Sequence, residues 1–455
     1  MCLVRLAVEP DISAAELESR GDGTAAPALR GRHCPTAGGL QRCGSRCTSV
    51  DDLAIEFAPG RGDRRGPVRS TILSSGGAWT DHRERDQLDA VLSAGTLSFG
   101  PRTAEFEQRF ATLVGARHAV AVSSCWAGFH LTFETLDFRP GDEVLTSIAA
   151  STPAIAAVTH VGARPVMVDV DPVTLTLDVA EAGRHVTPRT RAIMPGHFGG
   201  CPAAMDEVLA LAAQHQLAVV EDATHALPAW DHGQMIGSMG LASVFSLSQD
   251  LNITTGEGGV VTTDRADLAD LLRARRFYGV PAEWAPPVQF PGRARYEAAH
   301  TYGFGYQMAD LNAAVGLGQL PKLKVFHAIR SYYAGLYELG LSDLESLILP
   351  RAPLGAQHAW ALYVVRLRPE RLAISRDAFI ERLAAQNVVG SVDFVPLYAH
   401  GYYGAQHGLR AARFPNARAA HETSVSLPLY PRMTEADVWD VIRSVRQIVG
   451  ADTTH

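Results

Sequence analysis

Short, continuous apolar runs alternate with helix-like segments through the middle of the chain, and this alternation constrains the fold most. Such runs are typical of strands that helices cover on both faces. Right-handed crossovers between them give an open, mainly parallel sheet, with ligands expected at the carboxyl ends of its strands. The clearest runs are Ala119–Val122, Glu143–Leu145, Pro165–Val168, Ala192–Met194 and Leu217–Val220.

Apolar residues at helical spacing lie between and beyond these runs. Residues 102–114 are predicted to form a helix with Phe106, Phe110 and Leu113 on one face. Another carries Met205, Val208, Leu209 and Ala212, with Pro202 near its start. Further helices are predicted at 83–94, from 309 towards 339 with a break at Pro321, at 376–386 and at 435–449, where Thr434 and Asp437 match a capping pattern, and a strand at 361–365.

The length of 455 residues calls for more than one domain, because a single core stops growing at roughly 250–300 residues. Residues 1–70 have no helical or strand period and are predicted to be a disordered extension. Residues 71–320 are predicted to form a large α/β domain. Residues 321–455 are predicted to form a smaller α+β domain.

Composition excludes several function classes. The net charge of −7 argues against nucleic-acid binding, and 47% hydrophobic with 20% charged residues is ordinary for a globular protein. No apolar run reaches the roughly 18 residues of a membrane span, and charge interrupts the first residues too early for a signal peptide. We therefore expect a cytoplasmic protein without a membrane partner.

Metal binding is not expected. His33, Cys34, Cys43 and Cys47 could in principle hold zinc, but their spacing contains no tight Cys-x-x-Cys pair. Reduced, unpaired thiols are the favoured interpretation.

Several short motifs occur in one order, and together they resemble the DegT/StrS family of sugar aminotransferases. The resemblance covers about residues 79–449 and implies a fold-type-I pyridoxal-phosphate architecture, usually a homodimer that shares its active site. It also implies a small-molecule substrate, a nucleotide-linked keto sugar or a cyclitol. The motifs are Gly100-Pro101, Pro140–Val144, Val168–Asp171, Glu221–Ala223, Thr255–Gly259 and Leu427–Pro431.

Some family positions keep their chemistry. Asp222 follows a buried run, where the family's aspartate pairs with the pyridine nitrogen of the cofactor. His225 matches a Gln or His beside the cofactor ring, and Ser246 matches a serine that contacts phosphate.

Other family positions have changed. Leu251 stands where the family has the lysine that forms the Schiff base, and the chain's two lysines, Lys322 and Lys324, lie elsewhere. The phosphate-binding turn appears as Ser124-Cys125-Trp126, with an indole in place of a small hydroxyl, and Ser151 replaces the ring that stacks on the pyridine. Gly305 and Gln307 replace an Asn and an Arg.

A leucine has no amine, so no covalently held cofactor is expected, and specific binding of pyridoxal or pyridoxamine phosphate is disfavoured. The first hypothesis is a pocket reused for aldimine-independent chemistry in secondary-metabolite or amino-sugar biosynthesis. Its acid–base groups would be Asp222, His225, His197 and Glu257, with Cys125 a candidate nucleophile.

Two alternatives stay open. The chain is a non-catalytic partner, in a heterodimer with a lysine-bearing relative, or an unusual transaminase or dehydratase that uses free pyridoxamine phosphate. In a purely structural interpretation, Trp126 and Leu251 are core residues that fill the space of the family's cofactor.

Overall fold

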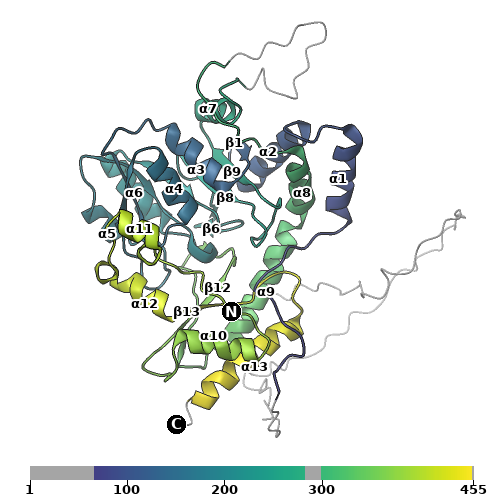
Figure 1. The fold of residues 1–455 in the computed structure, drawn as a ribbon, viewed down its shortest axis with the longest axis vertical. Coiled ribbons are helices and arrows are strands. Elements are labelled where there is room, and N and C mark those ends of the chain that lie inside the picture. The colour runs from purple at the N-terminus through teal and green to yellow at the C-terminus, as the bar shows by residue number, and fades with distance from the viewer. Residues whose placement is uncertain (1–65, 282–298, 453–455) are drawn as a thin grey trace, which may run out of the picture. The chain divides into compact units, whose positions relative to one another are not determined.

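A seven-stranded sheet forms the centre of the computed structural model, which describes residues 66–281 and 299–452. The strand order is β1-β9-β8-β5-β4-β2-β3. Neighbours from β3 through to β8 run parallel, whereas β9 is antiparallel to both β8 and β1. The predicted mainly parallel α/β sheet is confirmed (Figure 1). The strands are β1 (His118–Val122), β2 (Glu143–Ser147), β3 (Arg164–Val168), β4 (Thr190–Met194), β5 (Ala218–Asp222), β8 (Ala242–Ser246) and β9 (Gly259–Thr263).

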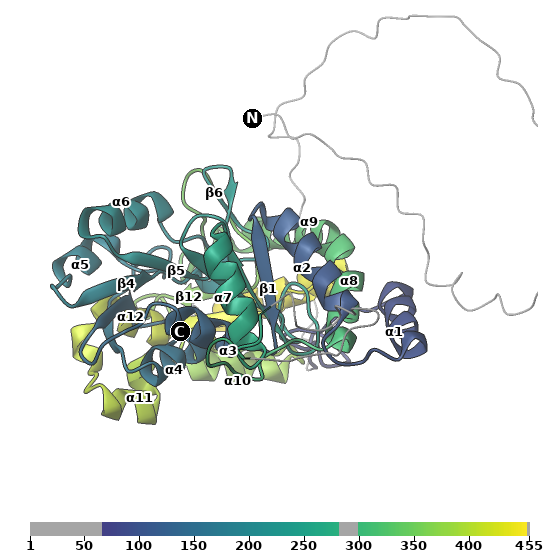
Figure 2. The ribbon, with the colours of Figure 1, turned by 90° about the horizontal axis from the view of Figure 1, so that it is seen from above.

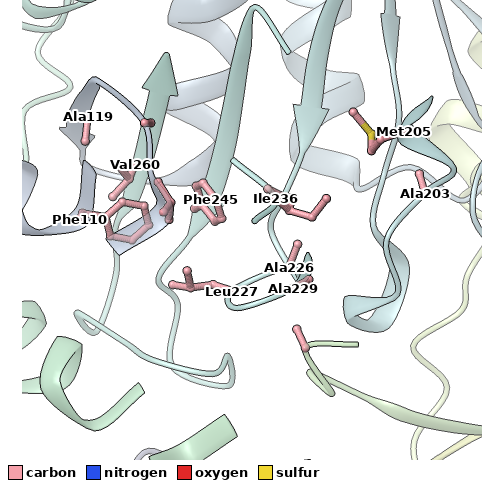
Figure 3. Packing of buried hydrophobic residues seen from close by; sticks show 14 of the residues in the cluster. Phe110, Ala119, Ala203, Met205, Ala226, Leu227, Ala229, Ile236, Phe245 and Val260 are labelled. Atoms are coloured by element: carbon pink, nitrogen blue, oxygen red, sulfur yellow. The ribbon is translucent and has the colours of Figure 1, made fainter. Parts of the chain in front are cut away.

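Both faces of the sheet are buried, which explains why its strands are apolar without alternation. Along β1, Ala119 and Ala121 belong to one hydrophobic cluster, while Val120 and Val122 belong to another. The first cluster includes side chains of α2 (Pro101–Val114) and α6 (Met205–His215). The second includes those of α3 (Cys125–Glu134), α4 (Thr152–His160) and α7 (Ala266–Arg276). Figure 3 shows Phe110 of α2 packed beside Val260 and Phe245 of the sheet.

The prediction that Leu113 shares one helix face with Phe106 and Phe110 is wrong. Leu113 is 37% exposed, whereas Val114 is buried. The buried face of α2 runs through Thr103, Phe106 and Phe110 to Val114, and at 3.6 residues per turn Leu113 lies beside that face.

The C-terminal part contains a three-stranded sheet in the order β10-β12-β13, with its own hydrophobic cluster. The predicted break at Pro321 is confirmed as a 3₁₀ turn between α8 (Asp310–Gln319) and α9 (Leu323–Leu341). The capping pattern is confirmed as well, since Thr434 Oγ1 accepts from the Asp437 amide and Thr434 N donates to the Asp437 carboxylate. The elements are β10 (Leu347–Ile348), β12 (Tyr363–Leu367), β13 (Ser424–Leu427), α10 (Arg376–Ala385), α11 (Gly401–Gln406), α12 (Pro415–Thr423) and α13 (Glu435–Asp452).

A small sheet of β11 (Ala356–Gln357), β6 (Trp230–Asp231) and β7 (Gln234–Met235) lies outside the main sheet, and Figure 2 shows β6 projecting at its edge. Two further helices, α1 (His82–Ala94) and α5 (Val179–Arg184), complete the large α/β region. Within the described ranges, no helix has the length and apolar character needed to cross a membrane.

Two residues near the predicted boundary at residue 70 contact the C-terminal part. Val68 N donates to Gln386 Oε1, and Arg69 pairs with Asp437 and Asp440 of α13. The boundary itself stays a prediction. The histidine and cysteines of the tail lie outside the described residues, and the predicted division at residue 320 stays a prediction.

Candidate functional site

A cavity of about 340 Å³ lies where β2, β4 and β5 end, at the carboxyl edge that the sequence predicts for a ligand site. Three loops from the large sheet form one wall, and the segment from Val392 to His400 forms the other. The lining residues are Ser147, 149–153, Leu175, 196–198, Asp222, Thr224, His225, Val392, Asp393, Val395 and His400.

Asp222 is the most firmly positioned charge in this cavity. Its side chain is buried, and both carboxylate oxygens accept a hydroxyl hydrogen bond. Ser151 Oγ donates to Oδ2 and Thr224 Oγ1 donates to Oδ1, each at 2.6 Å. Its backbone pairs with Pro195 and His197 at the end of β4. Each carboxylate oxygen has two lone-pair sites, so acceptor capacity is left for a ligand.

His225 is held in one tautomer beside Asp222. Its Nδ1 accepts a hydrogen bond from Gly199 N at 3.3 Å, so the neutral ring carries its proton on Nε2. Burial lowers the pKa of His225, and the negative charges of Asp222 and Asp393 oppose that effect only in part. The ring is therefore a neutral hydrogen-bond donor near pH 7.

His197 reaches the cavity wall, but its ring is closed off. Nε2 lies 3.3 Å from Glu221 Oε2, and Nδ1 accepts from Ala203 N at 3.0 Å. Burial of Glu221 disfavours its charge, yet the hydrogen bonds from His197, Ser243 and Gly240 lower the pKa of Glu221 overall. With both nitrogens engaged, the geometry favours a positioning role, and the predicted acid–base role of His197 stays a prediction.

Cys125 and Ser246 lie together next to this cavity. Burial raises the pKa of the Cys125 thiol, a hydrogen bond from Ser246 acts in the opposite direction, and the charge of Asp222 raises it further. The thiol form is therefore favoured, and a thiolate nucleophile is not supported.

The turn that the sequence predicts for a phosphate forms the start of α3. Ser124 caps α3 by accepting from Ala127 N. A Cβ on Gly259 would lie 2.6 Å from the Ser124 carbonyl oxygen and 2.7 Å from Cys125 N, which explains a glycine at this point. Leu251 is half-buried at a small hollow that also touches Thr224, His225 and Ser246.

Trp126 and Glu257 lie away from the cavity. Trp126 stacks on His130 at 5.0 Å between ring centroids and meets Tyr306 edge-on, so its indole belongs to an aromatic cluster. Glu257 is exposed and is absent from the described lining. No lysine lines the described cavity, since Lys322 pairs with Glu84 at 2.5 Å and Lys324 is exposed.

Thr224, Asp393 and His400 are among the lining residues that sequence reasoning missed. Thr224 had a local signal, since its amide and hydroxyl both donate to Asp222, two residues earlier, in an Asx-type turn. Asp393 and His400 had none, because they come from a segment about 170 residues further along the chain.

Comparisons with known proteins agree with this geometry. Residues 79–446 match the model of the DegT/DnrJ/EryC1/StrS aminotransferase family. The spore coat polysaccharide biosynthesis protein SpsC of Bacillus subtilis is 40% identical over 371 residues, covering 81% of this chain and 95% of that protein.

Solved structures share the fold. The aminotransferase TlmJ from Streptoalloteichus hindustanus is 29% identical, with a TM-score of 0.76 over 84% of this chain and 99% of that one. The putative sugar aminotransferase Spr1654 from Streptococcus pneumoniae, in its PLP form, is 22% identical, with a TM-score of 0.77 over the same shares, and shows likeness of fold alone.

Proposed function

The chain belongs to the DegT/DnrJ/EryC1/StrS aminotransferase family, and from this premise we propose that it transfers protons on a keto sugar without covalently bound pyridoxal phosphate. The observation that carries the proposal is the pairing of a fixed carboxylate, Asp222, with a neutral donor, His225, in one cavity. Such a pair suits acid–base chemistry at a carbon next to a carbonyl.

The residues do not fit a covalently held pyridoxal phosphate. By resemblance, Leu251 takes the position of the lysine, and no other lysine lines the described cavity. At the ring end, Ser151 takes by resemblance the position of the stacking ring, and its hydroxyl donates to Asp222 Oδ2. Ser124, Ser246 and the N-terminus of α3 would still suit a phosphate, so the mismatch lies at the ring and the attachment point.

The chemistry follows from the two side chains. The Nε2–H of His225 donates to the carbonyl oxygen of the sugar, and the carboxylate of Asp222 takes a proton from the adjacent carbon. The electron pair of the broken C–H bond forms an enolate whose oxygen His225 stabilises. Return of a proton from Asp222 to the same carbon, after exchange with solvent, regenerates the keto sugar and both side chains.

We also make proposals about the location, pathway and assembly of the protein. We propose action in the cytoplasm, in secondary-metabolite or amino-sugar biosynthesis. We propose a homodimer, or a heterodimer with a lysine-bearing relative. The family supports a sugar substrate, and SpsC, by its name, serves polysaccharide biosynthesis.

Solvent exchange tests the proposal. In D₂O, a nucleotide-linked keto hexose incubated with the protein should lose the proton signal next to its carbonyl. Asp222→Asn and His225→Gln should each slow this exchange by about 10²–10⁴-fold. Asp250→Asn, which changes an exposed carboxylate in the Leu251 segment, is the matched control and should keep the wild-type rate. Exchange no faster than in buffer would refute the proposal in favour of the partner-subunit hypothesis.

A further inference from the structure

Three side chains of metal-ligand type meet where the start of α6 approaches the β6–β7 hairpin. Asp206 lies in the first turn of α6, Asp231 ends β6, and His232 begins the turn to β7. One ligand atom from each lies within 4.8 Å of the others. His232 Nδ1 is 3.1 Å from Asp231 Oδ1 and 3.6 Å from Asp206 Oδ2.

Asp231 is the unusual member of this group. Its side chain is only 7% exposed, and it points at the other two ligands. Across the described ranges, His232 is the one group that reaches its carboxylate, and no hydrogen-bond donor from outside the group does. A buried carboxylate beside one exposed histidine is only partly compensated, so a cation would suit it.

The chain fixes these ligands from two separate elements. Met205, next to Asp206, and Ala229 and Ile236, on either side of the hairpin, are fully buried in one hydrophobic cluster. Figure 3 shows these side chains in that core.

The ring of His232 is also held from one side. Its backbone N–H donates to the Gly355 carbonyl at 3.1 Å. A Cβ on Gly355 would lie 2.9 Å from the ring atoms Cδ2 and Nε2, so the glycine allows the backbone to lie against the imidazole. Nδ1 is thereby directed at the two carboxylates.

We propose that Asp206, Asp231 and His232 bind a zinc ion that joins α6 to the β6–β7 hairpin. Zinc takes nitrogen and carboxylate oxygen ligands at about 2.0–2.2 Å in a tetrahedron, which separates the ligand atoms by about 3.3–3.6 Å. The separation of 3.6 Å lies within that range, and the separation of 3.1 Å is slightly shorter. Water completes the coordination, because Asp206 and His232 are exposed.

The location gives the ion a structural consequence. The hairpin begins five residues after His225, and α6 begins eight residues after His197. A zinc bridge would restrain the two segments that enter the cavity wall. It would stabilise the folded protein by mass action in proportion to zinc occupancy.

Calorimetric titration of the full chain with zinc chloride tests the site. The chain carries Cys2→Ser, Cys34→Ser, Cys43→Ser and Cys47→Ser, so that tail thiols cannot compete. One ion should bind, and Asp231→Asn and His232→Gln should each weaken binding at least tenfold. His82→Gln is the matched control, since His82 is an exposed histidine 3.8 Å from Asp81, and it should leave binding unchanged.

A second readout keeps the test independent of folding defects. Cobalt in place of zinc should give visible absorption without thiolate charge-transfer bands, and His232→Gln, at an exposed ring, should remove it while the circular dichroism stays unchanged. Two results would overturn the proposal and leave a simple histidine–aspartate contact. One is no zinc binding at zinc concentrations up to about 1 mM, the range of weak binding. The other is equal zinc binding in the wild type and the variants.

Discussion

Two carboxylate–histidine pairs lie back to back at the end of β5, and they differ in what surrounds them. Glu221 and His197 are closed inside the protein, and the side chains of both are fully buried. Asp222 directly follows Glu221, and it lines an open cavity together with His225. Neighbouring residues of a strand point to opposite faces. The same residue types therefore form a buried, hydrogen-bonded pair on one face of β5 and a candidate acid–base pair on the other.

The largest expected effect is on the closed pair. Glu221→Gln should lower the free energy of unfolding by about 1–3 kcal/mol, since it weakens the hydrogen bonds that His197, Gly240 and Ser243 make to a buried carboxylate. Asp222→Asn should lower it by about 1 kcal/mol or less, because hydroxyl partners remain for the amide. Urea unfolding of both variants measures the difference. Equal losses in the two variants would show that the pairs are not distinct in kind.

A smaller effect is expected in the pH dependence of stability. The lowered pKa of Glu221 means that its contribution is present above about pH 4.5, the ordinary value, and is lost as the pH falls through the folded-state pKa. The lowered pKa of His225 means that protonation favours the unfolded chain, so stability declines as the pH falls below about 6.5.

Unfolding free energies measured from pH 8 to pH 4 separate the two pairs. Glu221→Gln should flatten the curve below about pH 4.5, and His225→Gln should flatten it just below pH 6.5. If His225→Gln leaves the slope below pH 6.5 unchanged, the ring is not held neutral by its surroundings.

The fold was predictable from the sequence because its signals are local. Unbroken apolar runs such as Leu217–Val220 marked strands covered on both faces, and Pro321 marked the break between α8 and α9. Leu113 misled the prediction because its apolar character does not reveal which side of α2 faces the sheet.

The site was predictable only in part, because its contacts join distant residues. Asp222 was placed at the end of its strand from the sequence, but its partner Ser151 lies 71 residues away. Nor did the sequence indicate that Glu221 and the Ala203 amide engage the two nitrogens of His197. Nothing near Asp393 or His400 in the sequence indicated a cavity.

One measurement tests the central claim, that the open pair works without an aldimine. The protein is incubated with pyridoxal phosphate, reduced with borohydride, desalted, and assayed for solvent exchange on the keto hexose. We predict the same exchange rate before and after reduction, with no pyridoxyl-modified peptide from residues 79–310. Loss of exchange on reduction, together with a stoichiometric pyridoxyl adduct, would contradict the account.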